Sequence, residues 1–374
     1  TQNSRLSVRG ITSYSDNITP PSLPGFVQNN PLHNVNLTIS HTQTFSPTTL
    51  NEFHATLQRF ISPNEQTQSN AVTARELGFQ NNPVPYSTAV PGTEVDSYFQ
   101  NGTSGSGTTT SLGNAYVYQD ALSLVRGRHT IKIGGEYRIS RYAEWGEWDT
   151  RGDFEFGGSL TGNALADFLI GRPSTYSQRS PLNNSISRYS LIAYAQDDYK
   201  VNSRLTLNVG FRWDFNANPK ERDGKVGFWV PATFATGERS TKFPDAPLGT
   251  LYVGDPGMPD RVGFNHYGDW GTMGPRAGFA YDLSGNGKTV VRGAFGIFSI
   301  PVDLQQVNNS TERPPFDMIV DFNYPASYGN PFAGKIDPFP SWKPGVQYDL
   351  TPLLPLQGAP NCLCYRNGYS EQWN

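Results

Sequence analysis

The sequence predicts an all-β fold, an antiparallel meander of about nine to ten strands that forms part of a transmembrane outer-membrane β-barrel with long extracellular loops. Three observations predict this fold. Apolar and polar residues alternate over stretches long enough to cross a bilayer. Short links between these stretches alternate with long polar ones, and the composition is poor in charge but rich in aromatic residues.

The clearest strand runs from Arg204 to Phe215. One face carries only apolar residues, which are Leu205, Leu207, Val209, Phe211, Trp213 and Phe215. The other face carries Arg204, Thr206, Asn208, Gly210, Arg212 and Asp214. Strict alternation is a strand signal, and the length matches the roughly 9–11 tilted residues that cross a bilayer. We therefore expect the first face to contact lipid and the second to face a water-filled lumen.

The same alternation recurs along the whole chain, which predicts further strands of the same kind. In chain order the expected strands are Leu6–Tyr14, Val35–Ser40, Phe53–Gln58, Ala115–Val125, Thr130–Ser140, Ser190–Lys200, Arg204–Phe215, Arg276–Leu283 and Val291–Ile297, and Tyr369–Asn374 begins a tenth.

The links between these strands come in two lengths, and this decides the architecture. The short links read as hairpin turns: Ser46–Thr49, Arg126–His129, Val201–Arg204 and Ser284–Lys288. The long polar links are Asp16–Leu32, Ile61–Asn114, Tyr142–Arg188, Asn216–Gly274 and Pro301–Gly368. Short turns at one end and long loops at the other are the outer-membrane layout, in which the short turns are periplasmic.

Strand parity then orients the chain. Leu6–Tyr14 runs outward, and the following strands run inward and outward in turn. We expect the chain to begin at a periplasmic turn and to stop inside a strand. The prediction is therefore that residues 1–374 are a partial barrel, because a closed barrel needs its first and last strands to pair.

Composition agrees with this fold. The chain has 374 residues, a formal net charge of −3, 16% charged residues and 13% aromatic residues. Low charge with many aromatic residues suits a barrel that has aromatic girdles at its rims, and the near-neutral balance argues against a nucleic-acid partner. Cys362 and Cys364 are too few for a disulfide framework, and their oxidation state is left open.

One stretch, Gly162–Gly171, does not alternate. Leu165, Phe168 and Leu169 have helical spacing, and Gly171-Arg172-Pro173 would stop a helix. By parity the stretch lies in a long loop. We expect one or two helical turns that pack on the outer mouth of the barrel.

No catalytic constellation is evident, and we expect no enzyme, no cofactor and no metal site; substrate-binding residues are unknown. The run Gly285-Asn286-Gly287-Lys288 resembles part of a phosphate loop, but a hairpin turn explains it. Arg151-Gly152-Asp153 matches an integrin tripeptide, through which we expect no adhesion. The charges predicted to line the lumen are Lys132, Glu136, Arg138, Arg212 and Asp214, and we expect them to contact a plug, water or one another.

Several motifs resemble those of Oar-like TonB-dependent receptors. They occur in family order over most of the chain: His129–Arg138, Gly162–Gly171, Tyr194–Lys200, Arg204–Arg212, Gly274–Asp282 and Gly287–Gly293, with Leu23–Phe26 near the start. The resemblance implies a large plugged barrel, of 22 strands in such transporters. It also implies an N-terminal regulatory-like domain and a plug bearing the TonB box, and we expect both to lie outside residues 1–374.

The resemblance implies a function as well. We expect TonB-dependent import of a scarce, bulky nutrient, either a metal chelate or a glycan, in the outer membrane of a Gram-negative-type bacterium. The partners would be membrane lipid, the TonB complex through the missing plug, and the substrate. A passive porin or a surface adhesin built on a barrel is the alternative, and a soluble glycan-binding β-protein is a third class. An uncharged face over all of Arg204–Phe215 argues against the soluble protein.

Overall fold

The computed structural model describes residues 3–19, 26–68, 74–80, 90–101, 108–244, 246–258, 271–301, 303–308, 311, 316–335, 337, 339 and 368–373. Cys362 and Cys364 lie outside these residues. So do Leu23, Pro24 and Gly25 of the Leu23–Phe26 motif. No helix in the described ranges is both long and apolar enough to cross a membrane.

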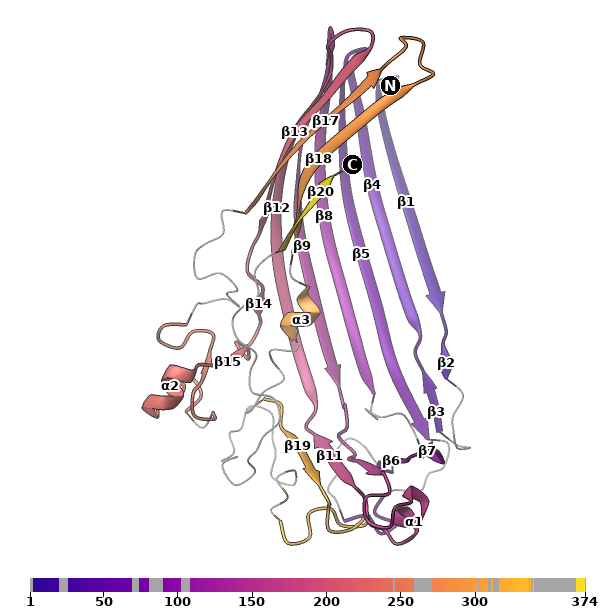
Figure 1. Ribbon diagram of the computed structural model, residues 1–374, viewed down its shortest axis with the longest axis vertical. Coiled ribbons are helices and arrows are strands. Elements are labelled where there is room, and N and C mark those ends of the chain that lie inside the picture. The colour runs from indigo at the N-terminus through magenta and orange to yellow at the C-terminus, as the bar shows by residue number, and fades with distance from the viewer. Residues whose placement is uncertain are drawn as a thin grey trace.

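Ten long strands form one curved antiparallel sheet (Figure 1), and each pairs with the next long strand along the chain. They are β1 (Ser4–Ser15), β4 (Leu32–Ser46), β5 (Thr49–Gln68), β8 (Thr109–Arg126), β9 (His129–Gly146), β12 (Leu182–Lys200), β13 (Leu205–Asn216), β17 (Thr272–Asp282), β18 (Val290–Ile300) and β20 (Gly368–Trp373). The predicted fold class, with nine strands and the start of a tenth, is confirmed. The sheet is open, because β1 and β20 each have one neighbour on this path.

All four predicted hairpin turns lie at one end of the sheet, drawn at the top of Figure 1, and the long loops lie at the other. In the link between β8 and β9, Gly127 has a φ of +59°, which a two-residue hairpin of the primed type requires and glycine adopts without strain. In the link after β17, both oxygens of Asp282 accept backbone N–H groups, from Gly285 at 2.9 Å and Gly287 at 2.7 Å. The phosphate-loop-like run is therefore a turn.

Several strands are longer than predicted, so the assigned loops were too long. β9 continues to Gly146 and β12 begins at Leu182, so both ends of the predicted loop 142–188 are strand. β5 likewise extends to Gln68 and β8 begins at Thr109. Two short strands, β2 (Ile18–Thr19) and β3 (Phe26–Asn29), lie in the first predicted loop. The strands thus project beyond the stretch that the alternation marks.

The long loops are themselves folded. Three of them contribute to a five-stranded sheet, here called the cap sheet, at the loop end (Figure 1): β6 (Gly92–Val95), β7 (Phe99–Asn101), β10 (Asp153–Phe156), β11 (Thr175–Arg179) and β19 (Ile319–Asn323). Its core is aromatic, with Phe154, Phe156 and Tyr176 almost fully buried. A fourth loop contains β14 (Lys220–Glu221), β15 (Gly227–Trp229), α2 (Pro231–Thr236) and β16 (Thr250–Tyr252).

The predicted loop helix is present as α1 (Ala164–Leu169), beside the cap sheet. Asn163 caps its first turn by accepting the N–H of Ala166 at 3.0 Å, and Gly171 follows its end with a φ of +68°. Leu165 and Phe168 pack against the cap core, whereas the sequence predicted packing directly on the outer mouth of the barrel. Leu169 does not, because its side chain is 74% exposed.

Candidate functional site: the lumenal wall

The lumenal wall is the concave face of the ten-stranded sheet, and strand register determines which residues reach it. Ser40 pairs with His54, His54 with Gln119, and Gln119 with Glu136. Paired residues on neighbouring antiparallel strands point to the same side of a sheet. These four side chains, contributed by β4, β5, β8 and β9, therefore form one polar row across the wall.

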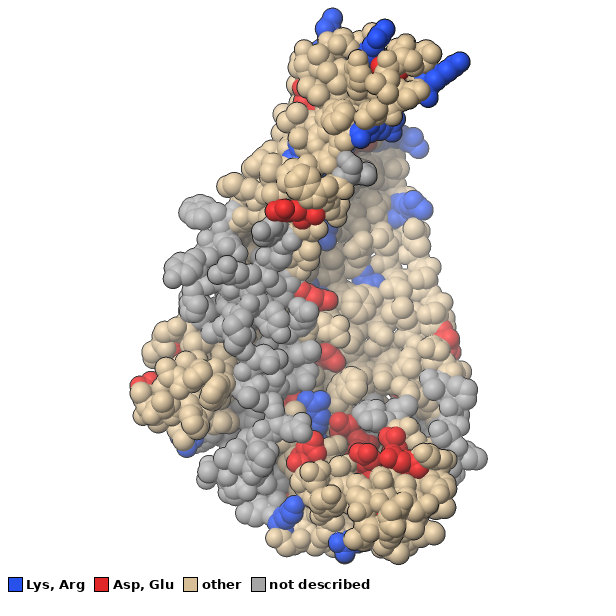
Figure 2. Space-filling model, in the orientation of Figure 1, with Lys and Arg blue, Asp and Glu red and all other residues tan. Residues whose placement is uncertain are grey.

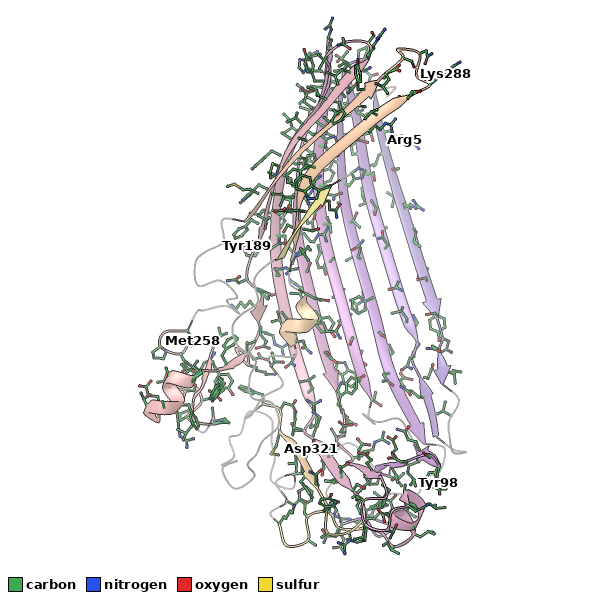
Figure 3. All side chains as sticks on the ribbon, viewed as in Figure 1. Arg5, Tyr98, Tyr189, Met258, Lys288 and Asp321 are labelled. Carbon is green, nitrogen blue, oxygen red and sulfur yellow. The ribbon has the colours of Figure 1, made fainter. Side chains whose placement is uncertain are left out.

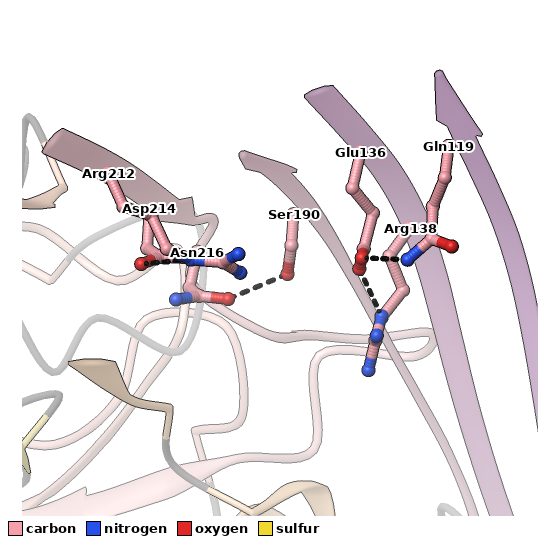
Figure 4. Close-up of polar contacts among 7 residues, drawn as sticks. All are labelled: Gln119, Glu136, Arg138, Ser190, Arg212, Asp214 and Asn216. Carbon is pink, nitrogen blue, oxygen red and sulfur yellow. Dashed lines mark hydrogen bonds and ion pairs between the residues drawn. The ribbon is translucent and has the colours of Figure 1, made fainter. Parts of the chain in front are cut away.

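The predicted lumenal charges lie on this wall and bond to one another (Figure 4). The Glu136 carboxylate accepts hydrogen bonds from Gln119 Nε2 at 2.7 Å and Arg138 Nε at 2.8 Å. The Nε of Arg212 donates to both carboxylate oxygens of Asp214, at 2.9 and 3.0 Å. The expectation of contacts among these charges is confirmed for four of the five residues.

The fifth predicted charge, Lys132, lies 3.8 Å from the Glu52 carboxylate on β5. It borders a hollow of about 420 Å³ that also contacts Glu136, Arg212 and Arg276. Acidic and basic groups line this hollow together, so the wall can hydrogen-bond a polar solute or a protein surface of either charge. The sequence placed His54 and Arg276 on the polar face without naming them as site residues, and Glu52 was missed altogether.

A short helix, α3 (Leu304–Asn308), lies against the lumenal face of β9 and β12 (Figure 1). Its Leu304 and Val307 are buried against Tyr142 and Ile186 of the wall. Asn308 Nδ2 donates a 2.7 Å hydrogen bond to the Glu144 carboxylate. The loop between β18 and β20 therefore folds inward.

Glu144, the wall residue in this contact, belongs to a series of hydrogen-bonded polar side chains that is largely buried. Tyr142 Oη donates to the same Glu144 oxygen that Asn308 contacts, at 2.9 Å. Ser111 Oγ lies 3.2 Å from that hydroxyl. Sequence reasoning missed this cluster because it assigned Tyr142 and Glu144 to a loop. A second hollow, of about 670 Å³, lies beside it and contacts Phe60, Tyr142 and Leu304.

The cap sheet lies at the loop end of the wall, and the helix α1 beside it carries a buried carboxylate, Asp167. Asp167 of α1 accepts the Thr161 hydroxyl at 2.7 Å and the N–H groups of Leu160 and Thr161 at 3.1 and 2.9 Å. The Thr161 hydroxyl above all, helped by the two backbone donors, lowers the pKa of Asp167 against the opposing effect of burial. The charged carboxylate thereby holds Leu160 and Thr161, which precede α1, in place against the helix.

The integrin-like tripeptide lies in the cap as well. Arg151 is 6% exposed and Asp153 begins β10, so the tripeptide is not displayed as a free loop. Burial lowers the pKa of the Arg151 guanidinium, while Asp153, Glu147 and Asp149 raise it. This supports the expectation that adhesion does not use it.

Adjacent carboxylates in β12 point to opposite sides of the sheet. Asp197 lies 2.6 Å from His129 Nδ1, and Asp198 accepts a 2.6 Å hydrogen bond from Asn208 of the lumenal wall. Within the described residues, no three His, Cys, Asp or Glu side chains come together as metal ligands would. The wall's chemistry is therefore hydrogen bonding and ion pairing.

An antiparallel meander with an apolar outer face, a polar inner face and folded loops at one end defines the wall of a membrane-spanning β-barrel. A family model described as the outer membrane beta barrel domain matches residues 1–374. The chain belongs to this family, and it is an outer-membrane protein.

Solved structures with a similar chain are receptors and transporters. They include FpvA of P. aeruginosa bound to a heterologous pyoverdine–iron complex, at 13% identity and a TM-score of 0.33, with 80% of this chain and 42% of that chain covered. The P. aeruginosa ferripyoverdine receptor bound to ferripyoverdine has 11% identity, a TM-score of 0.24 and the same coverage. The ferric citrate transporter FecA in unliganded form has 10% identity and a TM-score of 0.21, with 79% and 54% covered.

The chain thus spans less than two thirds of the length of these relatives. The comparison with curated proteins found no match.

Proposed function

We propose that residues 1–374 form part of the barrel wall of an Oar-like TonB-dependent receptor, which imports a scarce, bulky nutrient such as a metal chelate or a glycan. The observation that carries the proposal is that ten strands do not close the sheet, since β1 and β20 lie at its two ends. A barrel built on this wall has more than ten strands. Barrels of about 16–18 strands enclose an aqueous channel, and those of about 22 strands enclose a plugged lumen.

The lumenal wall suits a barrel that holds something polar. Several of its charges are already paired within the wall, as in Glu136 with Arg138 and Arg212 with Asp214. Charges that are paired in this way can face water, a plug or a passing solute at little cost.

The open edges support the view that this wall belongs to a larger domain. β1 and β20 each present backbone groups that no neighbour in the described sheet satisfies, and such groups are not tolerated in hydrocarbon. In the proposed protein, further strands complete the barrel. A plug and an N-terminal regulatory-like domain lie outside residues 1–374, and the TonB complex acts through that plug.

The second candidate is a passive porin, or a surface adhesin, on the same barrel. The hollows on the lumenal wall favour the porin, because an unplugged lumen would leave them open to water. In either case the chain acts by binding and passage, and we propose no catalytic centre in it.

Uptake by cells with and without functional TonB separates the two candidates. The complete gene is expressed in an outer membrane, and radiolabelled ferric chelates and fluorescent oligosaccharides are supplied. The proposal expects uptake that stops without TonB. Energy-independent uptake, together with steady ion conductance of the purified protein in planar bilayers, would instead establish a porin.

A further inference from the structure

A row of polar and basic residues crosses the outer surface of the sheet near its loop end. Register links the row continuously: Arg59 pairs with Asn114, Asn114 with Arg141, Arg141 with Ser187, and Ser187 with Lys220. Each of these positions is offset by one residue from the lumenal set, so the side chains point outward. With neighbouring strands about 4.8 Å apart, the three basic residues are spaced by roughly 10 Å along the row.

The row lies where the apolar surface ends. On β9 the outward positions from Ile131 to Ile139 are apolar, glycine or tyrosine, and Arg141 is the next outward residue. Nine residues are enough for a tilted strand to cross the hydrocarbon. Because the loop end is extracellular, Arg141 is at the level of the headgroups of the outer leaflet.

On the same outer surface, aromatic residues lie next to the row on the side nearer the membrane centre, as they do at a membrane interface. Tyr116 and Tyr189 both pair with Ile139, one row nearer the membrane centre. Figure 3 shows Tyr189 on the outer side of the wall, well above the cap sheet in that view. The Arg141 guanidinium carbon is 5.9 Å from the centre of the Tyr116 ring. Tyrosines of this kind sit at the boundary between lipid chains and headgroups.

The positive charge of the row is not neutralised within the protein. Arg59, Arg141 and Lys220 are all exposed, and no described carboxylate forms an ion pair with any of them. The acidic residues nearest to Lys220 along the chain are engaged elsewhere. Asp223 pairs with Arg222 at 3.1 Å and Lys225 at 3.3 Å.

Glu221 is engaged too. It accepts the backbone N–H groups of Asp223 and Lys225, each at 2.8 Å. The row therefore needs its counter-charge from outside the protein.

We propose that Arg59, Arg141 and Lys220 bind the phosphate groups of a phosphorylated glycolipid in the outer leaflet, whose acyl chains lie along the apolar surface below them. A guanidinium can donate two parallel hydrogen bonds to one phosphate, and Lys220 supplies a point charge to a second. Asn114 and Ser187, between the basic residues, offer hydrogen bonds to sugar hydroxyls.

The test measures lipid binding by the complete protein, purified in detergent, with bis-phosphorylated lipid A as the probe in native mass spectrometry. The triple variant R59Q/R141Q/K220Q should bind at least about tenfold more weakly than the natural protein, because each basic residue near a phosphate adds comparable attraction. The matched control K200Q/R204Q/K288Q removes three exposed basic residues at the short-turn end, where Figure 2 shows basic side chains gathered and Figure 3 shows Lys288. It should bind as tightly as the natural protein.

Two further measurements use the natural protein alone, so they do not depend on whether the variants fold. They distinguish a lipid phosphate from free phosphate as the ligand. Enzymatically dephosphorylated lipid A should bind the natural protein at least about tenfold more weakly. Inorganic phosphate at millimolar concentration should not displace the intact lipid. Equal binding by the natural protein and the triple variant would overturn the proposal, as would equal binding of the dephosphorylated lipid or competition by inorganic phosphate.

Discussion

The outer and inner faces of β13 predict opposite responses to a new charge. Phe211 is 48% exposed on the outer face, midway along the apolar strip from Leu205 to Phe215. Its partners on the flanking strands are Ala195 and Pro275, so an introduced arginine would find no carboxylate beside it. Near the bilayer midplane, Phe211→Arg should destabilise the barrel by about 2–4 kcal/mol. That is roughly a 30- to 900-fold change in the folding equilibrium.

Two neighbouring sites provide the controls for that magnitude. Leu207 pairs with Tyr199, one residue before the end of β12, so it lies near the short-turn interface, and Leu207→Arg should cost only about 0–1 kcal/mol. Asn208 faces the lumen and contacts Asp198, which an arginine could still contact, so Asn208→Arg should cost less than about 1 kcal/mol.

The assay is reversible urea unfolding of the complete protein in lipid vesicles, read by tryptophan fluorescence and by heat-modifiable migration. Phe211→Arg should be clearly more destabilising than either Leu207→Arg or Asn208→Arg. An Asn208→Arg variant as unstable as Phe211→Arg would refute the assignment of faces. A Leu207→Arg variant as unstable as Phe211→Arg would refute the assignment of depth.

Three further outcomes follow from other contacts. Asn308→Ala removes the 2.7 Å bond to Glu144 and should release α3, measured as faster hydrogen exchange over residues 304–308, with Asn286→Ala in an exposed turn as the control. Asp167 has a lowered pKa in the folded state, so its stabilisation is complete above the unfolded value of about 3.9 and is lost as pH falls through the folded value. Amides 164–169 should therefore lose protection selectively in acid, and Asp167→Asn should lose it already at neutral pH; unchanged protection in both would contradict this. Lys132→Gln should change stability by less than about 1 kcal/mol in urea unfolding, since its ion pair with Glu52 is 3.8 Å long and partly exposed, and a larger loss would show that the pair is stronger than its geometry implies.

Alternation located every long strand because the two faces of each strand meet different solvents. In β13 the outer face is apolar over its whole length, so the strand and its orientation follow from the sequence. In β9 the pattern stops after Ile139, although the strand continues to Gly146. Beyond that point Arg141 faces outward and Tyr142 inward, so the polarity of the two faces is reversed. The alternation of apolar and polar residues therefore marks the part of a strand that crosses the membrane, and not the whole strand.

The cap and the α3 contact could not be predicted for a different reason. β6 and β10 come from separate loops and pair in parallel, with Phe154 opposite Thr93. Asn308 reaches Glu144 across more than a hundred residues of chain. Such pairings depend on where the barrel brings the loops, and no local pattern encodes them. Two lumenal ion pairs, Glu136 with Arg138 and Arg212 with Asp214, lie within one strand and follow from the alternation. The contact of Lys132 on β9 with Glu52 on β5 depends on how the strands pair.

The cap sheet changes how the three loops that build it can behave. Because β6 pairs with β10, β10 with β11, and β11 with β19, each loop is hydrogen-bonded to another, and all three share one aromatic core. A break in any one of them exposes the core of the others. The three loops are therefore coupled like the parts of a single small domain, with one melting transition, and a protease that cuts one of them would destabilise the whole cap sheet.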